Sequence, residues 1–391
     1  MTDVRGSGST SVPSDLGTDD AVTVADVIAV LGAAYPQRLA EPWDSVGLVC
    51  GDPADPARRV LICVDVTDEV VDAVVAGDVG LIVAHHPLLL RGVDSVAADT
   101  PKGRVVHRLI RAGVALFTAH TNADSARPGV SDALAEALEV IDTVPIEPKP
   151  VPAIDKWVVM VPEGNTDQVS EAMFAAGAGA IGEYRDCAWW VVGTGQFEAQ
   201  EDANPTIGEI GARTRVDEAR VEMVAARGRR PAVLAALRAA HPYEEPAFDI
   251  LELAEMSGDT GLGRVGSLAV PITLGEFTQR AAQRLGGPWG VRATGDPDRL
   301  VTTVAVCGGA GDSLLDTVGS LGVDVYLTGD LRHHPADEAC RAGGPALVDA
   351  GHWATEFPWC AQVAELLSAD PGVPVEIYAT PTDPFALHAR P

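Results

Sequence analysis

The sequence has no C-x-x-C pair, no apolar stretch long enough to cross a membrane, and half as many basic as acidic residues. Its six cysteines stand far apart, and we expect them to be reduced and mostly buried. A spanning helix needs about 20 consecutive apolar residues, which no segment supplies. Residues 1–20 are rich in Gly, Ser, Thr and Asp and lack the apolar core of a signal peptide. We therefore expect a flexible tail over residues 1–20 and a cytoplasmic protein without a membrane segment.

The excess of acidic residues limits the partners. Lys plus Arg is 28 and Asp plus Glu is 56, so the formal net charge is −28. Such a surface repels a phosphate backbone, and nucleic-acid binding is not expected. A small anionic substrate stays compatible with this charge, because a bound metal ion can invert the local field.

The order of predicted elements indicates an α/β fold in more than one part. Strands and helices alternate over residues 21–150, which predicts a largely parallel sheet. The proline-rich stretch at 146–154 indicates a linker. Residues 152–258 then follow the order strand, helix, strand, strand, helix, strand, which is a split ferredoxin-like α+β unit with a loop at 194–210. Strands and helices alternate again over residues 259–391. We therefore predict one α/β domain of two similar halves, interrupted by an inserted domain.

Side chains that bind metals follow four of the predicted strands. Strand ends of this kind are where α/β proteins place their chemistry. His352 and Glu356 are spaced so that both fall on one face of a helix. Imidazoles and carboxylates without cysteine suit zinc, iron, manganese or cobalt. The four groups are His85 with His86, His120 with Asp124, Asp330 with His334, and His352 with Glu356.

The adjacent histidines favour two metal ions over one. His85 and His86 end an apolar run, and neighbouring residues on an extended strand point in opposite directions. A carboxylate with two oxygens can sit between two ions, and two ions can clamp both the attacking and the leaving group of a hydrolysis.

Other motifs leave alternatives open. The glycine cluster at 307–313 is either a phosphate-binding turn or a tight strand-to-helix turn, and the absence of a P-loop lysine favours the second. Trp189 and Trp190 are expected in a core or a subunit interface. The segment 241–246, His-Pro-Tyr-Glu-Glu-Pro, is expected to form a rigid turn whose exposed acids could contact a partner.

Five stretches of the chain resemble the GTP cyclohydrolase 1 type 2 family, also called Nif-three-like dinuclear-metal hexamers. The resemblance extends over nearly the whole chain from about residue 21. The insert resembles the PII- or CutA-like domain of longer family members, through residues 193–197, 204–208 and 241–246. The five stretches are residues 41–48, 84–88, 119–124, 326–330 and 349–356.

The resemblance implies a set of ligands and an assembly. Glu356 would bridge two divalent ions, one bound also by His86 and Asp124 and the other by His85 and His352. Ala123 and the segment 332–334 depart from the family pattern without touching these ligands. The family further implies a toroidal homohexamer with its metal sites facing an internal cavity.

We therefore expect a dinuclear-metal hydrolase that attacks GTP, another nucleotide or a related heterocycle. His120 or His334 is a candidate for moving the proton. A di-metal phosphoesterase and a non-catalytic metal-binding or regulatory hexamer remain alternatives.

Overall fold

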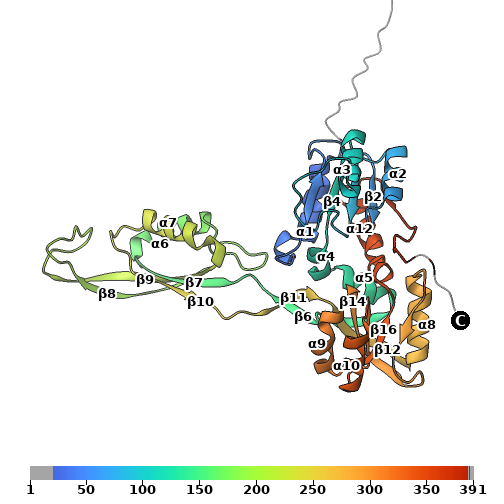
Figure 1. The fold of residues 1–391 in the computed structure, drawn as a ribbon. Coiled ribbons are helices and arrows are strands. Elements are labelled where there is room, and N and C mark those ends of the chain that lie inside the picture. Colours follow the sequence, from blue (N-terminus) through green and yellow to red (C-terminus); the bar gives the residue numbers. More distant parts are fainter. Residues whose placement is uncertain (1–20, 386, 388–391) are drawn as a thin grey trace, which may run out of the picture. The chain divides into compact units, whose positions relative to one another are not determined.

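The computed structural model describes residues 21–385 and residue 387, so the tail expected over residues 1–20 lies outside the described part. Contacts divide the chain into two compact units, Met1–Lys149 with Asp259–Pro391 and Pro150–Gly258. Figure 1 shows the helices and strands of both units. None of the described helices is long and apolar enough to cross a membrane.

The larger unit contains a first sheet with the strand order β1-β4-β3-β2-β17. Its strands are parallel except β1, which pairs antiparallel with β4 at the edge. Every residue of β2, β3 and β4 is buried and nearly all are apolar, as expected for parallel strands covered on both faces. The strands are β1 (Gly47–Cys50), β2 (Val60–Cys63), β3 (Leu81–Ala84), β4 (Ala115–Thr118) and β17 (Val375–Ile377).

Helices cover both faces of this sheet. One face packs against α2 (Asp68–Ala76) and α3 (Pro101–Ala112), and the other against α1 (Val24–Ala34) and α12 (Pro358–Ala369). Thr67 caps α2 by accepting a hydrogen bond from the Val70 N–H, as the acidic start of that segment predicts.

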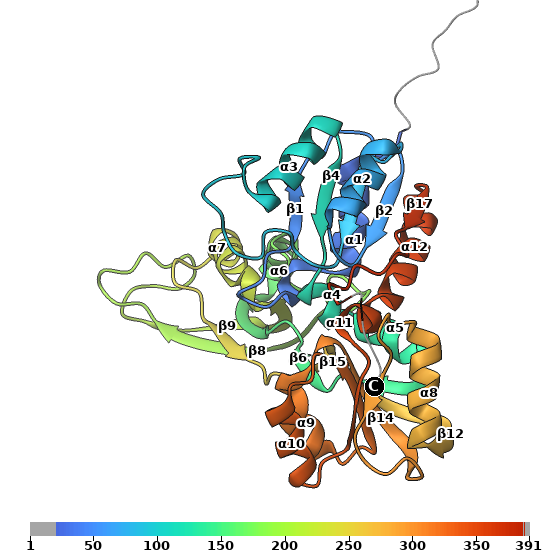
Figure 2. The same ribbon diagram turned by 45° about the vertical axis from the view of Figure 1, so that its right-hand side comes forward.

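The second sheet of the larger unit has the order β13-β16-β15-β14-β12-β5. The prediction of a largely parallel sheet is wrong for its outer strands, because only β14, β15 and β16 run parallel. Figures 1 and 2 show α8 on one side of this sheet and α9 and α10 on the other. The elements are β5 (Val140–Val144), β12 (Arg264–Thr273), β13 (Arg292–Ala293), β14 (Leu300–Ala310), β15 (Val325–Gly329), β16 (Ala346–Asp349), α8 (Leu274–Leu285), α9 (Leu315–Leu321) and α10 (His333–Arg341).

One hydrophobic core joins the two sheets. It contains residues from α1 and α12 on the first sheet, from α8 on the second, and from α5 (Val130–Ala137) between them. Two short helices, α4 (Thr121–Ser125) and α11 (His352–Glu356), follow β4 and β16. Because the sheets share this core, the carboxyl ends of strands from both can supply residues to one site.

The smaller unit is a four-stranded antiparallel sheet with two helices. Its elements follow in the order β-α-β-β-α-β, and its strand order is β10-β7-β9-β8. Thr194–Glu198 pairs with β9, so the loop predicted at 194–210 is confined to 199–212. The elements are β7 (Ile154–Pro162), α6 (Thr166–Ala175), β8 (Ala188–Glu198), β9 (Arg213–Ala226), α7 (Arg230–Ala240) and β10 (Phe248–Glu252).

The proline-rich stretch is only in part a linker. β6 (Glu147–Pro150) pairs with β11 (Ser257–Leu262) in a two-stranded ribbon. Proline has no N–H group to donate to a neighbouring strand. When prolines occupy every second position, however, the N–H groups of the residues between them all point to one edge of the strand, and that edge can still pair. A sequence that signals an irregular linker can therefore still form an edge strand.

Candidate metal centre

The histidine pair lies directly after β3, where the backbone leaves the first sheet. His85 is fully buried, and its Nδ1 donates to the Ala119 carbonyl oxygen at 2.9 Å. His86 is partly exposed, and its Nδ1 donates to Asp65 Oδ1 at 2.7 Å. Because both acceptors are oxygens without a proton, the ring protons lie on Nδ1 and the Nε2 lone pairs are free to bind a metal.

The second sheet supplies the other half of the site through α11. Gly351 precedes this helix with a φ of 88°, which a glycine adopts without strain. His352 Nδ1 donates to Asp330 Oδ2 at 2.7 Å, which fixes the ring as Asp65 fixes His86. Glu356 follows one turn later, with its Oε1 3.2 Å from His352 Nε2. The predicted helical presentation of this pair is confirmed.

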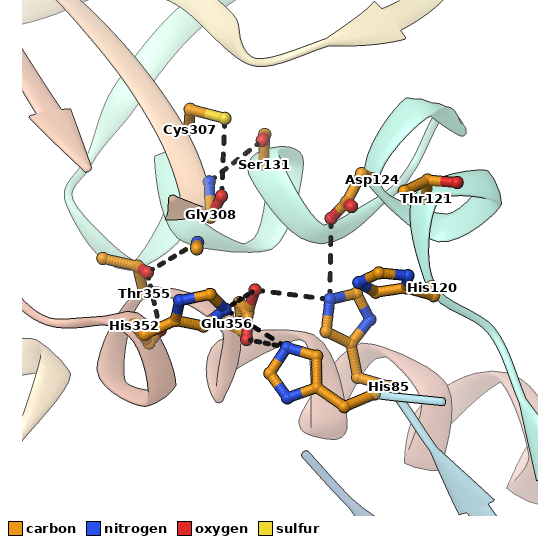
Figure 3. Close-up of polar contacts among 12 residues, drawn as sticks. His85, His120, Thr121, Asp124, Ser131, Cys307, Gly308, His352, Thr355 and Glu356 are labelled. Atoms are coloured by element: carbon orange, nitrogen blue, oxygen red, sulfur yellow. Dashed lines mark hydrogen bonds and ion pairs between the residues drawn. The ribbon is translucent and has the colours of Figure 1, made fainter. Parts of the chain in front are cut away.

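Glu356 lies at the centre of the cluster, as Figure 3 shows for His85, His352 and Asp124 around it. Its carboxylate is 3.4 Å from His85 Nε2 and 3.1 Å from His86 Nε2. Only 3% of its surface is exposed. Asp124, carried by α4, places its Oδ1 3.7 Å from His85 Nε2. The structure thus brings all five sequence-predicted metal ligands together.

The partition of these ligands differs from the one the resemblance implied. Asp124 lies beside His85 rather than His86. The Nε2 atoms of His86 and His352 are 3.2 Å apart, so these two form the other set. The physical reason is that His85 turns into the core toward α4, whereas His86 faces the second sheet.

The surroundings of His85 Nε2 fit a bound metal ion. Among the described residues this buried atom has no hydrogen-bond partner, and it faces carboxylate oxygens of Glu356 and Asp124 at 3.4 and 3.7 Å. Leaving a buried polar atom unsatisfied costs about 1–3 kcal/mol, and coordination removes that cost. The Nε2 atoms of His86 and His352 face each other at 3.2 Å, so they can share one proton or, once deprotonated, one metal ion.

The electrostatics of the cluster also favour a bound cation. Burial opposes a charge on His86, but Glu356 and Asp65 outweigh it and raise the pKa of His86 to about 10. Burial also opposes a charge on His352, and Glu356 with Asp330 raises its pKa to about 11. The three rings in turn outweigh the effect of burial and lower the pKa of Glu356 far below its usual range. The space between the rings therefore favours positive charge.

The two proton-carrier candidates lie in different places. His120 groups with His85 and His86 as a possible ligand set, and its Nδ1 donates to Asp44 Oδ1 at 2.8 Å. His334 is exposed at the start of α10, where its ring lies against His333. The clusters of potential ligand atoms among the described residues include His120 but not His334.

Sequence reasoning missed three residues of the site. Asp65 and Asp44 orient His86 and His120, although the sequence analysis gave neither a role. Asp65 comes two positions after the end of β2, and His86 two positions after the end of β3, so the strand-end pattern contained a signal for it. Gly309, which the sequence analysis placed in a turn, belongs to β14 and lies against Glu356.

Replacing Gly309 with alanine is expected to displace Glu356. A Cβ at this position would lie 2.3 Å from Glu356 Oε1 and 3.1 Å from His352 Nε2. Metal affinity, measured by titration calorimetry, should fall by roughly tenfold or more, as for other changes that misorient ligands.

Gly343→Ala is the matched control for this prediction. Gly343 also has a positive φ, of 75°, but nothing lies within 4 Å of an added Cβ. Both variants carry the backbone strain, of about 1 kcal/mol, and only Gly309→Ala crowds the ligands. Equal metal affinity in the two variants would contradict the assigned role of Gly309.

A two-sheet α/β fold whose strand ends gather histidines and carboxylates defines a candidate metal-binding protein. The chain belongs to the Duf34/NIF3 family (NGG1p interacting factor 3), whose model matches residues 22–384. The family resemblance inferred from the sequence motifs is thus confirmed.

Relatives match along almost their whole length. A Mycobacterium tuberculosis protein named "GTP cyclohydrolase 1 type 2 homolog" is 57% identical over 370 residues, which are 94% of this chain and 97% of that protein. A Bacillus subtilis protein of the same name is 37% identical over 365 residues, covering 92% and 97%.

Solved structures of relatives share the fold. A Bacillus cereus protein related to NIF3 is 35% identical with a TM-score of 0.73, covering 94% of this chain and 99% of that one. A Staphylococcus aureus protein is 26% identical with a TM-score of 0.78 and the same coverage.

Proposed function

We propose that the protein is a dinuclear-metal hydrolase that acts on a nitrogen heterocycle, with GTP as the first candidate substrate. The observation that carries the proposal is the meeting of two histidine sets on one buried carboxylate, Glu356. The printed name of the relatives supports GTP as the first compound to assay.

In this proposal Glu356 would be a ligand of divalent ions such as zinc, iron, manganese or cobalt. His85 and Asp124 would form one set of ligands with it, and His86 and His352 the other. When bound, such ions supply Lewis-acid activation of water and neutralise charge that develops in the substrate. Asp65 and Asp330 hold the His86 and His352 rings so that Nε2 stays available.

His120 is the proposed proton carrier. Asp44 accepts its Nδ1–H, and Thr121 donates its backbone N–H to the same carboxylate at 3.0 Å. This fixes the ring and leaves Nε2 able to accept a proton and return it. The exposed position of His334 does not support that role for it.

A cavity of about 270 Å³ adjoins the cluster and includes His86 and His352 in its wall. Trp289 packs on Gly351, where a Cβ would come within 2.9 Å of its ring, and its Nε1 donates to Asp383 Oδ2 at 3.1 Å. Aromatic walls suit a flat ring. The described lining residues include acids but no lysine or arginine, so bound metal ions would have to neutralise the phosphates of a nucleotide in this cavity.

We also propose that the protein forms the homohexamer that the family resemblance implied, with the smaller unit as a PII/CutA-like module. The supporting observations are its β-α-β-β-α-β order and an apolar run on β8. Trp189 and Trp190 in this run are 60% and 53% exposed, more than a monomer normally leaves bare in one place. Light scattering in solution tests the assembly, and a monomeric mass would refute it.

The activity is tested by loading the purified protein with each candidate metal and assaying formate release from GTP. Formate release that depends on the metal would support the proposal. Phosphate release without formate would replace it with a phosphoesterase, and release of neither product across the metals would remove GTP as the substrate.

A further inference from the structure

Three motifs that the metal centre does not use line one cavity in the smaller unit. They are residues 193–197 on β8, 204–208 in the following loop and 241–246 before β10. The first contributes Phe197 to the wall, the second Ile207 and the third Tyr243, around a volume of about 260 Å³. Segments far apart in the sequence thus build one concave surface.

Hydrogen bonds hold the three segments in place around the cavity. The Asn204 N–H donates to Glu244 Oε1 at 2.9 Å, and the Thr206 hydroxyl donates to the Pro242 carbonyl oxygen at 2.6 Å. The Phe197 and Tyr243 rings meet edge to face, with centroids 5.8 Å apart. The segment predicted to be a rigid turn is therefore one wall of a prepared pocket.

Glu218, on β9, is set into this pocket by two features. A Cβ at Gly195 would lie 1.8 Å from Glu218 Oε2, so the carboxylate occupies space that only a glycine leaves free. The Tyr243 hydroxyl donates to Glu218 Oε1 at 3.0 Å. The glycine of the first motif and the tyrosine of the third thus position one acidic group.

The charge of the wall selects the ligand. Glu244 and Glu245 line the cavity together with Glu218, and the described lining residues include no lysine, arginine or histidine. Carboxylates repel phosphates and other anions, whereas they and aromatic faces attract a cation. Phe197 and Ile207 offer apolar surface to the rest of the molecule.

The spacing of the acids argues for an organic cation rather than a metal ion. The described groups whose ligand atoms converge within 4.8 Å all lie in the metal centre of the larger unit. Glu218, Glu244 and Glu245 are not among them, so they do not form a compact cage for a metal ion.

We propose that this cavity binds a small organic cation, with an ammonium or guanidinium group against Glu218 and an apolar body against Phe197 and Ile207. This gives the smaller unit a ligand-binding function of its own, which stands whether or not the larger unit hydrolyses GTP.

The test uses phenethylamine as the probe and the full chain in titration calorimetry. Phenylacetate is the control ligand, because it has the same ring on a chain of similar length and the opposite charge. Phenethylamine should bind once per chain, and roughly tenfold or more tighter than phenylacetate. Equal affinities, or no binding of phenethylamine, would overturn the proposal.

Variants then locate the binding site. Glu218→Gln should weaken phenethylamine binding roughly tenfold, and Tyr243→Phe should weaken it less, because the ring remains. Glu209→Gln, which removes an exposed acid of the same loop outside the cavity wall, is the matched control and should bind normally. Unchanged binding in Glu218→Gln, or equal loss in Glu209→Gln, would refute the site.

Discussion

Replacing Glu356 with glutamine is expected to abolish stable metal binding while the fold persists. The amide has the size of the carboxylate, but it lacks the charge that three histidine rings surround. It can also present only one oxygen, so it cannot bridge two ions as the carboxylate can. Changes to residues that only support ligands cost about 10–100-fold in affinity, and the loss of a shared ligand should exceed this.

The measurement is metal content by elemental analysis after dialysis, together with titration calorimetry and circular dichroism. Glu365→Gln removes an exposed acid from α12 and serves as the matched control. The metal content of Asp330→Asn should lie between those of Glu356→Gln and the control, because this change frees only the His352 ring. If Glu356→Gln retained the metal content of the control, its central role would be refuted.

The residue types of the centre were predictable from sequence because each follows a strand. A buried apolar run that stops at His85 and His86, or shortly before His352, marks a strand end without any knowledge of the fold. The i,i+4 spacing of His352 and Glu356 defines a shared helix face in the same way. These are local properties, and the structure brings the residues together.

The pairing of the ligands was not predictable, because it depends on how two sheets share a core. His86 and His352 are 266 positions apart in the chain, and their contact requires the α5 and α12 helices to pack between the sheets. Alternation along a strand says that His85 and His86 diverge. It does not say which of them faces the second sheet.

Residues that position the ligand side chains were not predicted from the sequence for a related reason. By residue type alone, Asp65 cannot be told apart from an ordinary exposed aspartate. Only its 2.7 Å contact with His86 gives it a role. Gly309 was placed in a turn because a glycine pattern indicates backbone freedom. The group that leaves no room for a side chain at this position is the carboxylate of Glu356, which lies 47 positions later in the sequence.

Replacing Arg264 with methionine is expected to destabilise the larger unit by about 3–5 kcal/mol, the range for breaking a buried ion pair by removing one partner. Arg264 is fully buried and begins β12, which follows the insert and β11. It donates to Asp132 at 2.7 and 2.6 Å, and to the carbonyl oxygens of Gly261, Gly263 and Ala126 at 2.5–2.8 Å. Methionine fills similar space, so the loss of stability comes from Asp132 and the three carbonyl oxygens, which are left without a hydrogen-bond donor.

Arg280→Met is the matched control, because Arg280 forms an ion pair with the half-exposed Glu139 at 3.1 Å. Such a surface pair contributes up to about 1 kcal/mol. Urea unfolding followed by circular dichroism compares the two variants, with the first transition assigned by limited proteolysis. Since Ala126 comes two residues after Asp124, Arg264→Met should also weaken metal binding more than the control does. Equal stability of the two variants would show that the buried guanidinium does not hold the chain on either side of the insert together.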